Sequence, residues 1–249
     1  MGLLTAELRK IQMVVFDRFM RSSDNPDEAR LLAEASKQIP KDRRVVIVDS
    51  DLAAALTIDA STSTGAISLQ GESTATSTTI TGGTGAFSFT SSSAGSFSIT
   101  TGAADDVIDV SGAANTAFIN TAAGDDEVRI GAAANVTAAD VISGGDGNDT
   151  ITSGAGNDNI TGGSANDTIL GGANNDTIST GDGANKVDGG TGNDTFTGGL
   201  GNDKLTGGGG SNTFIVDSGS DSITDFTSAD ILQIRSGATA SAAVANSYT

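Results

Sequence analysis

The stretch Gly144–Thr152 reads GGDGNDTIT, and its nine-residue pattern recurs between residues 140 and 232. An apolar residue holds the eighth place of each copy: Ile142, Ile151, Ile160, Ile169, Ile178, Val187, Phe196, Leu205, Phe214, Ile223 and Leu232. An acidic or amide residue lies two places earlier: Asp140, Asp149, Asp158, Asp167, Asp176, Asn185, Asp194, Asp203, Asn212, Asp221 and Asp230. Gly fills the second place of eight consecutive copies, from Gly145 to Gly208. Three columns in one register exclude a disordered chain.

Each column has a physical reason. The first six residues of a copy must make a tight turn with positive φ, which Gly and Asn tolerate. The last three, such as Thr150–Thr152, form a minimal strand that points its central side chain inward. Two copies, or 18 residues, close one flattened coil. Successive coils then stack as parallel strands, which predicts an all-β parallel β-roll.

The stacking brings the acidic column together in two rows of turns. Asp149, Asp167 and Asp203 fall in one row with Asn185, and the other row holds Asp140, Asp158, Asp176, Asp194 and Asn212. Adjacent turns in a row lie ~4.8 Å apart, so their carboxylates repel each other. A cation between them converts that repulsion into ligation, with backbone carbonyls completing the shell. Calcium fits because it accepts roughly six to eight oxygen ligands in loose geometry.

The tracts Gly144–Thr152, Gly189–Thr197 and Gly198–Thr206 resemble the repeats-in-toxin (RTX) nonapeptide GGxGxDxUx. The resemblance is strong over Gly144–Ile215 and weak over Gly102–Ile130, where most glycines are lost. It implies several calcium ions, type I secretion without an N-terminal signal, and folding in external calcium. The metal ligands it suggests are Asp140, Asp149, Asp158, Asp167, Asp176, Asp194, Asp203, Asp221, Asn185, Asn212, Asp106 and Asp126.

Several repeats depart from the motif. Asn185 and Asn212 offer a neutral amide oxygen, and Lys186 adds a positive charge, so we expect weaker or different coordination beside Asn185. Ser153 and Thr180 replace the first Gly of their repeats. The third Gly is replaced by Ala165 and Asn174. Asn tolerates the left-handed backbone conformation, whereas Ala in that conformation costs more free energy.

Composition supports a metal-binding repeat protein. The 249 residues include 34 Gly, 2 Pro and only 4 % aromatic residues, too few large side chains for a conventional core. Without Cys or His, disulfides are excluded and zinc, haem or iron–sulfur chemistry is improbable. The net charge of −18 disfavours nucleic acid and anionic lipid. No segment approaches the ~20 apolar residues of a membrane span.

The chain divides into four predicted parts. Residues 1–50 form a helical head, a cap or assembly element, with one helix over Leu4–Phe19, a second from Asn25 to before Pro40, and a strand at Val45–Val48. Residues 51–139, rich in Ser, Thr and Gly, form an irregular β-solenoid, because short apolar bursts recur roughly every ten residues. The calcium-binding β-roll covers 140–232. Residues 233–249 form a tail, either a secretion signal or an assembly segment.

The sequence favours a structural protein over an enzyme. It has no His or Cys, and its carboxylates are repeated equivalents rather than one asymmetric site. We therefore predict a secreted, calcium-binding protein that self-assembles into a bacterial surface layer, matrix fibre or filament, with a cell-surface polysaccharide as a further partner. The alternative is a calcium-dependent secretion or adhesion module of an RTX toxin, protease or adhesin.

Overall fold

The structure is a computed structural model of the chain. It describes residues 13–15, 45–47, 56–71, 77–92, 95–111, 116–131 and 138–235. These residues contain strands, turns and bends but no helix, so none of them forms a helix that could cross a membrane. The predicted tail from residue 236 onward lies outside the described residues.

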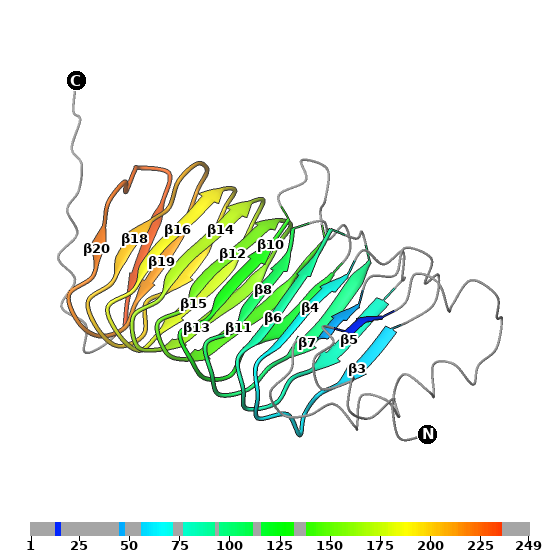
Figure 1. Ribbon diagram of the computed structural model, residues 1–249. Coiled ribbons are helices and arrows are strands. Elements are labelled where there is room, and N and C mark those ends of the chain that lie inside the picture. The colour runs from blue at the N-terminus through cyan, green and yellow to red at the C-terminus, as the bar shows by residue number, and fades with distance from the viewer. Residues whose placement is uncertain are drawn as a thin grey trace, which may run out of the picture.

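Two long parallel sheets make up the body of the protein (Figure 1). The nine-stranded sheet contains, from one end to the other, β4 (Ile67–Gly71), β6 (Phe87–Ser91), β8 (Val107–Val110), β10 (Glu127–Ile130), β12 (Thr150–Ala155), β14 (Thr168–Ala173), β16 (Lys186–Thr191), β18 (Lys204–Thr206) and β20 (Ser222–Ile223). The ten-stranded sheet contains β3 (Leu56–Asp59), β5 (Ser77–Thr81), β7 (Ser96–Thr100), β9 (Ala117–Asn120), β11 (Val141–Asp146), β13 (Asn159–Ser164), β15 (Thr177–Gly181), β17 (Thr195–Thr197), β19 (Thr213–Val216) and β21 (Ile231–Ile234).

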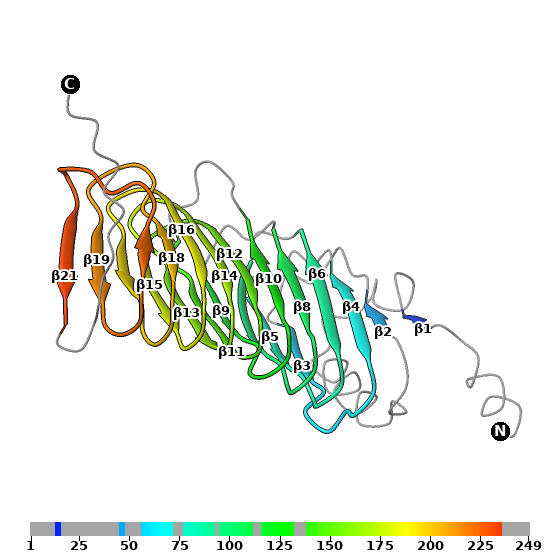
Figure 2. The ribbon, with the colours of Figure 1, turned by 90° about the vertical axis from the view of Figure 1, so that its left-hand side faces the viewer.

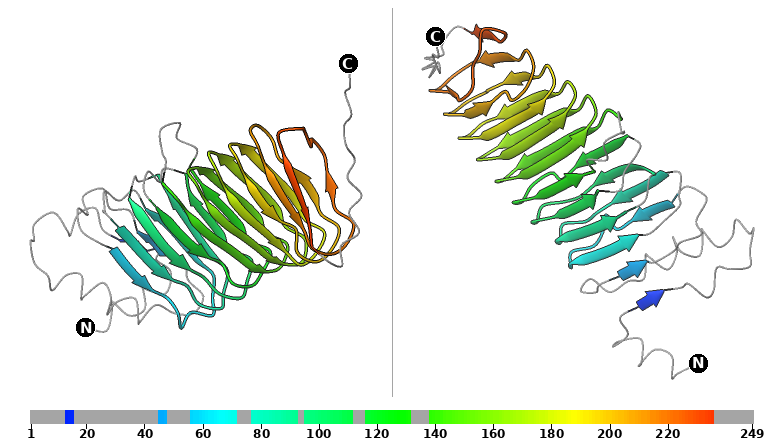
Figure 3. Two further views of the ribbon diagram at one scale, coloured as in Figure 1. Left: turned by 180° about the vertical axis from the view of Figure 1, so that it is seen from behind. Right: turned by 90° about the horizontal axis from the view of Figure 1, so that it is seen from above.

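Consecutive strands alternate between the sheets, so each pair of strands forms one coil of a solenoid. The coils stack along a single axis, as Figures 2 and 3 show. In the repeat region Ile142 pairs with Ile160, and Ile151 pairs with Ile169. The hydrogen bonds between neighbouring coils there join residues 18 apart, for example from Asp149 to Asp167. The predicted parallel β-solenoid is therefore confirmed, as is its two-repeat coil.

The core lies between the sheets and takes mainly one apolar side chain from each repeat strand. Every member of the apolar column from Ile142 to Ile223 is at most 2 % exposed. Leu232 is partly buried against the end of this core. Two aromatic members, Phe196 and Phe214, stack with ring centroids 4.8 Å apart. Stacking identical columns from coil to coil thus builds a core with few aromatic residues.

Most strands of the repeats are longer than the predicted three residues, although β17 and β18 keep that length and β20 is shorter. In β12, for example, the ladder continues through Gly154 and Ala155, which pair with Gly172 and Ala173. The turns behave as expected, because Ala165 and Asn174 both have φ of 78°. These two residues occupy the left-handed conformation that Gly adopts in the other repeats.

The upstream coils share the same two sheets but are irregular in length. The ladder bonds span 19 residues from Phe87 to Asp106, 20 from Asp106 to Asp126 and 23 from Asp126 to Asp149. Phe89 and Phe97 fill the core there, with ring centroids 5.9 Å apart. The sheets pass from this irregular part into the regular repeats without a break in strand order.

The N-terminal part differs from the sequence prediction. Met13–Val15, inside the predicted helix, forms strand β1, which pairs in parallel with β2 (Val45–Ile47). The prediction of helix is therefore wrong at these residues, and the predicted helical head is not supported. Val14 pairs with Val46, so a strand partner distant in sequence outweighs the local helical spacing. The strand predicted at Val45–Val48 is confirmed as β2, which lies beside β4 (Figure 2). The remainder of both predicted helices lies outside the described residues.

Candidate metal-binding rows

All twelve predicted ligands are buried, with at most 3 % of each residue exposed. They form two rows that follow the solenoid axis. The first row contains Asp106, Asp126, Asp149, Asp167, Asn185, Asp203 and Asp221. The second row contains Asp140, Asp158, Asp176, Asp194 and Asn212, and ends at the half-buried Asp230.

One oxygen of each row side chain is held by the coil before it. The backbone N–H of Asp149 donates to Asp167 Oδ1 at 2.9 Å, and that of Asp158 donates to Asp176 Oδ1 at 2.9 Å. The amide residues keep this bond, since Asp167 N–H donates to Asn185 Oδ1 at 2.8 Å. The hydrogen-bonded ladder therefore continues through Asn185 and Asn212, although the row of charges does not.

The second oxygen is the chemically important one. Eight buried side-chain atoms of the described residues have no hydrogen-bond partner: Oδ2 of Asp106, Asp126, Asp149, Asp158, Asp167, Asp176 and Asp194, and Nδ2 of Asn185. Every one belongs to a row. A buried polar atom without a partner costs about 1–3 kcal/mol, and more when it is charged. Seven such carboxylate oxygens in two rows therefore require a further positive partner.

The electrostatics agree with this requirement. Burial, together with a smaller effect of neighbouring carboxylates in the rows, raises the pKa of Asp126, Asp140 and Asp176 to about 7. Burial also raises the pKa of Asp149 and Asp167 to about 6, against the lowering effect of the ladder hydrogen bonds. Without a cation, the ionised rows are disfavoured near neutral pH.

The free oxygens lie close to backbone carbonyls of the glycine turns. A Cβ atom placed on Gly144 would lie 2.2 Å from Asp149 Oδ2 and 2.7 Å from the Gly162 carbonyl oxygen. Gly162 shows the same arrangement with Asp167 Oδ2 and the Thr180 carbonyl, at 2.4 and 2.5 Å. The described residues contain no cluster of three carboxylates, so an ion in these rows needs such carbonyls as ligands. Carboxylate and carbonyl oxygens together are the donors that calcium prefers.

A further column of side chains, which the repeat pattern alone did not assign, also joins neighbouring coils. The fifth place of the repeats is often Asn, and these amides hold the next coil on the outside of the turn. Asn148 Oδ1 accepts the Asn166 N–H at 3.0 Å, and Asn175 Oδ1 accepts the Asn193 N–H at 2.7 Å. Asp125 plays the same part upstream, where it accepts the N–H of Asn148. The nine-residue recurrence of Asn before the row residue is the signal that could have revealed them.

Comparison with known families agrees with this geometry. Four copies of the RTX calcium-binding nonapeptide repeat match the chain, over residues 137–169, 152–187, 161–196 and 188–223. Residues 137–223 belong to the RTX repeat family. RTX repeats bind several calcium ions, and the row oxygens without a hydrogen-bond partner are suitable ligands for such ions. No curated protein and no solved structure matches the chain.

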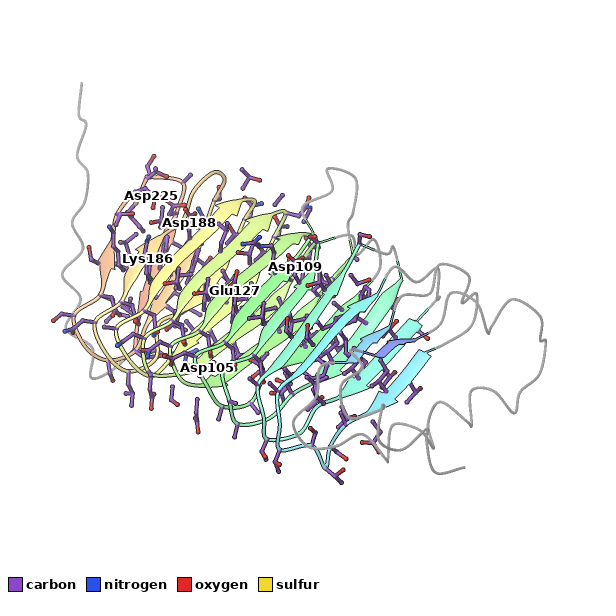
Figure 4. The ribbon with its side chains drawn as sticks, viewed as in Figure 1. Asp105, Asp109, Glu127, Lys186, Asp188 and Asp225 are labelled. Carbon is purple, nitrogen blue, oxygen red and sulfur yellow. The ribbon has the colours of Figure 1, made fainter. Side chains whose placement is uncertain are left out.

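The RTX repeats contain the departures noted in the sequence. Lys186 lies exposed on the outer face of β16, in register with Thr168 and Lys204, rather than in a row (Figure 4). The row of carboxylates is therefore interrupted by the neutral amide of Asn185, and the charge of Lys186 plays no part in the row. The row carboxylates and the turn carbonyls are the groups that would hold calcium, which would supply the positive charge that the buried oxygens lack.

Proposed function

We propose that this chain is an extracellular structural protein whose copies associate, in calcium, into a layer, fibre or filament. The observation that supports it is the outer face of the ten-stranded sheet, called here the uncharged face. Among the described residues, the outward positions of β5 to β21 that alternate with the core carry no charge, and charged side chains lie only at the strand ends, as at Asp146 and the Asp217–Arg235 ion pair. These outward positions are Thr79, Thr81, Ser98, Thr100, Phe118, Asn120, Val141, Ser143, Asn159, Thr161, Thr177, Ser179, Thr195, Thr197, Thr213, Ile215, Ile231 and Gln233.

The opposite sheet differs in charge. The outer face of the nine-stranded sheet carries Asp109, Glu127, Arg129, Lys186, Asp188 and Lys204, several of which Figure 4 labels. Arg129 pairs with Glu127 at 3.3 Å on this face. A chain of net charge −18 repels its own copies. The uncharged face is the long surface on which two copies approach with least repulsion.

This face also exposes apolar side chains. Phe118, Val141 and Ile231 are 54, 40 and 55 % exposed on it. Threonine methyl groups and these apolar side chains lie in straight columns, because the parallel register repeats from coil to coil. A second copy with the same face offers a matching array of columns. Association of this kind buries the exposed apolar side chains of both partners.

The RTX repeats support the proposed extracellular location, because proteins with these repeats are typically exported by type I systems. Their β-rolls are typically structural rather than catalytic. Cell-surface polysaccharide remains a predicted attachment partner. The second candidate function is a calcium-dependent secretion or adhesion module, which would remain monomeric in calcium.

The test is assembly of the purified chain in a chelator and in millimolar calcium, followed by sedimentation velocity and electron microscopy. We expect ordered polymers in calcium only. Thr177→Asp places a charge on the uncharged face and should reduce assembly at least tenfold. Thr168→Asp makes the same change at the equivalent exposed site of the nine-stranded sheet and should leave assembly unchanged. Monomers in saturating calcium would contradict the proposal and favour the module.

A further inference from the structure

The first residue of each repeat lies beside the free row oxygen. We call the space there the cradle: it lies between the row carboxyl of the same repeat and the first-position carbonyl of the following coil. In Gly171 an added Cβ would lie 2.5 Å from Asp176 Oδ2 and 2.8 Å from the Gly189 carbonyl oxygen. The cradles of Gly144 and Gly162 have the same two walls. Glycine therefore leaves open the space that these oxygens surround.

Four repeats fill the cradle with a hydroxyl side chain. They begin with Thr101, Thr121, Ser153 and Thr180, each at most 5 % exposed. Thr121 Oγ1 donates to the Gly144 carbonyl at 2.8 Å, and Ser153 Oγ donates to the Gly171 carbonyl. In both cases the acceptor is the first-position carbonyl of the following coil. The same hydroxyls lie against the row carboxyls, Thr121 against Asp126 and Ser153 against Asp158.

Thr180 shows what a filled cradle does to a row. Its hydroxyl hydrogen-bonds to the Gly198 carbonyl and, at 3.3 Å, to Asp203 Oδ2. Asp203 Oδ2, in the following coil, is accordingly absent from the set of buried oxygens without a partner, whereas Oδ2 of Asp106, Asp126 and Asp158 in the other three hydroxyl repeats belongs to it. The repeat of Thr180 also carries Asn185 in place of the row Asp. This repeat therefore combines a hydroxyl at its first place with a neutral amide in the row.

We propose that the first residue of each repeat decides whether its coil takes a calcium ion. Glycine leaves the cradle open to the ion, and serine or threonine closes it with a hydroxyl that bonds the next coil directly. The two occupants exclude each other, because the Cβ and Oγ atoms stand among the oxygens that would ligate the metal. The inference rests on the proposed ligation of calcium by the row residues.

This rule divides the solenoid into two kinds of coil. Upstream, Thr101 and Thr121 close successive cradles of the first row. Downstream, Gly144, Gly162, Gly171 and Gly189 leave theirs open beside a free Asp oxygen. The upstream coils are therefore joined by a hydroxyl bond at the place where the downstream coils leave room for an ion.

The experiment counts calcium ions bound per full-length chain, by equilibrium dialysis against radioactive calcium. Ser153→Gly opens a closed cradle and should bind one ion more than the wild type. Gly171→Ser closes an open cradle and should bind one ion fewer. Gly209→Ser is the matched control, since a Cβ there meets only Thr191 Cγ2 at 3.9 Å, and it should leave the count unchanged.

The outcomes separate this inference from the proposed calcium ligation. A wild-type chain that binds no calcium overturns the ligation, and the inference with it. If the wild type binds calcium and Ser153→Gly binds the same number of ions per chain, the inference about the first residue is overturned and the proposed calcium ligation is not. Circular dichroism in millimolar calcium shows whether Gly171→Ser folds. If that variant does not fold, the count of Ser153→Gly decides the question.

Discussion

The close stacking of the glycine turns leads to a sharp prediction for Gly163→Ala. Gly163 has φ of 131°, and a Cβ there would lie 1.8 Å from the Gly145 carbonyl oxygen and 2.7 Å from its carbon. The obstructing atoms belong to the backbone of the neighbouring coil, so no side-chain rotation relieves the contact. The coils must separate locally, or the turn must change its conformation.

The cost has two parts. An L-residue in a left-handed conformation costs roughly 1–2 kcal/mol. Separation of the coils weakens the bonds on either side of Gly163, such as that from Asp182 N–H to the Gly163 carbonyl at 2.8 Å. Each lost hydrogen bond costs about 0.5–1.5 kcal/mol net. With one or two bonds lost, we expect the free energy of unfolding to fall by about 2–4 kcal/mol.

The assay is urea unfolding in saturating calcium, followed by circular dichroism. Gly209→Ala is the control, because its Cβ has open space and its φ is not in the left-handed region. The free energy of unfolding of this control should be unchanged or should rise by about 1 kcal/mol, because Ala reduces the conformational entropy of the unfolded chain. Equal unfolding free energies for both variants would refute the close stacking of coils at Gly163.

Asp167→Asn removes a row charge and should weaken calcium binding at least tenfold in a calcium titration, whereas Asp188→Asn, on the outer face of β16, should not. Ala165→Gly removes an Ala from the left-handed conformation, at φ 78°, and should raise the free energy of unfolding by about 0.5–1 kcal/mol in the same urea assay. A lower free energy of unfolding would show that Ala165 is not strained in this conformation. Burial raises the pKa of Asp126 and Asp176 to about 7 and that of Asp149 to about 6, so the metal-free fold is most stable below the ordinary Asp pKa and loses stability as the pH rises toward 7. In a chelator, circular dichroism should show more β-structure at pH 4.5 than at pH 7.5, and the opposite order would contradict the raised pKa values. In calcium the ions replace these protons, so the apparent calcium affinity should fall as the pH is lowered from 7 to 5.

The sequence by itself determined the repeating part of the fold. The apolar column from Ile142 to Ile223 predicts the core, because a column that repeats every nine residues meets itself once each coil closes. The Asp column likewise predicts two rows of oxygen ligands at the turns. Positive φ at Ala165 and Asn174 could be predicted too, since the same place is Gly in the other repeats. These properties are local and periodic, and a single repeat already contains them.

The tertiary structure alone decided which atoms meet across coils. It shows that the ladder holds one oxygen of each row residue, as between Asp149 and Asp167, and leaves the second oxygen of seven row aspartates without a partner. It also shows Ser153 and Thr180 inside the turns, bonded to the next coil, where the sequence indicated only a lost Gly. At Met13–Val15 a strand partner some thirty residues away replaces the helix that local spacing predicts. Pairing between distant segments depends on the whole stack of coils, and no local pattern encodes it.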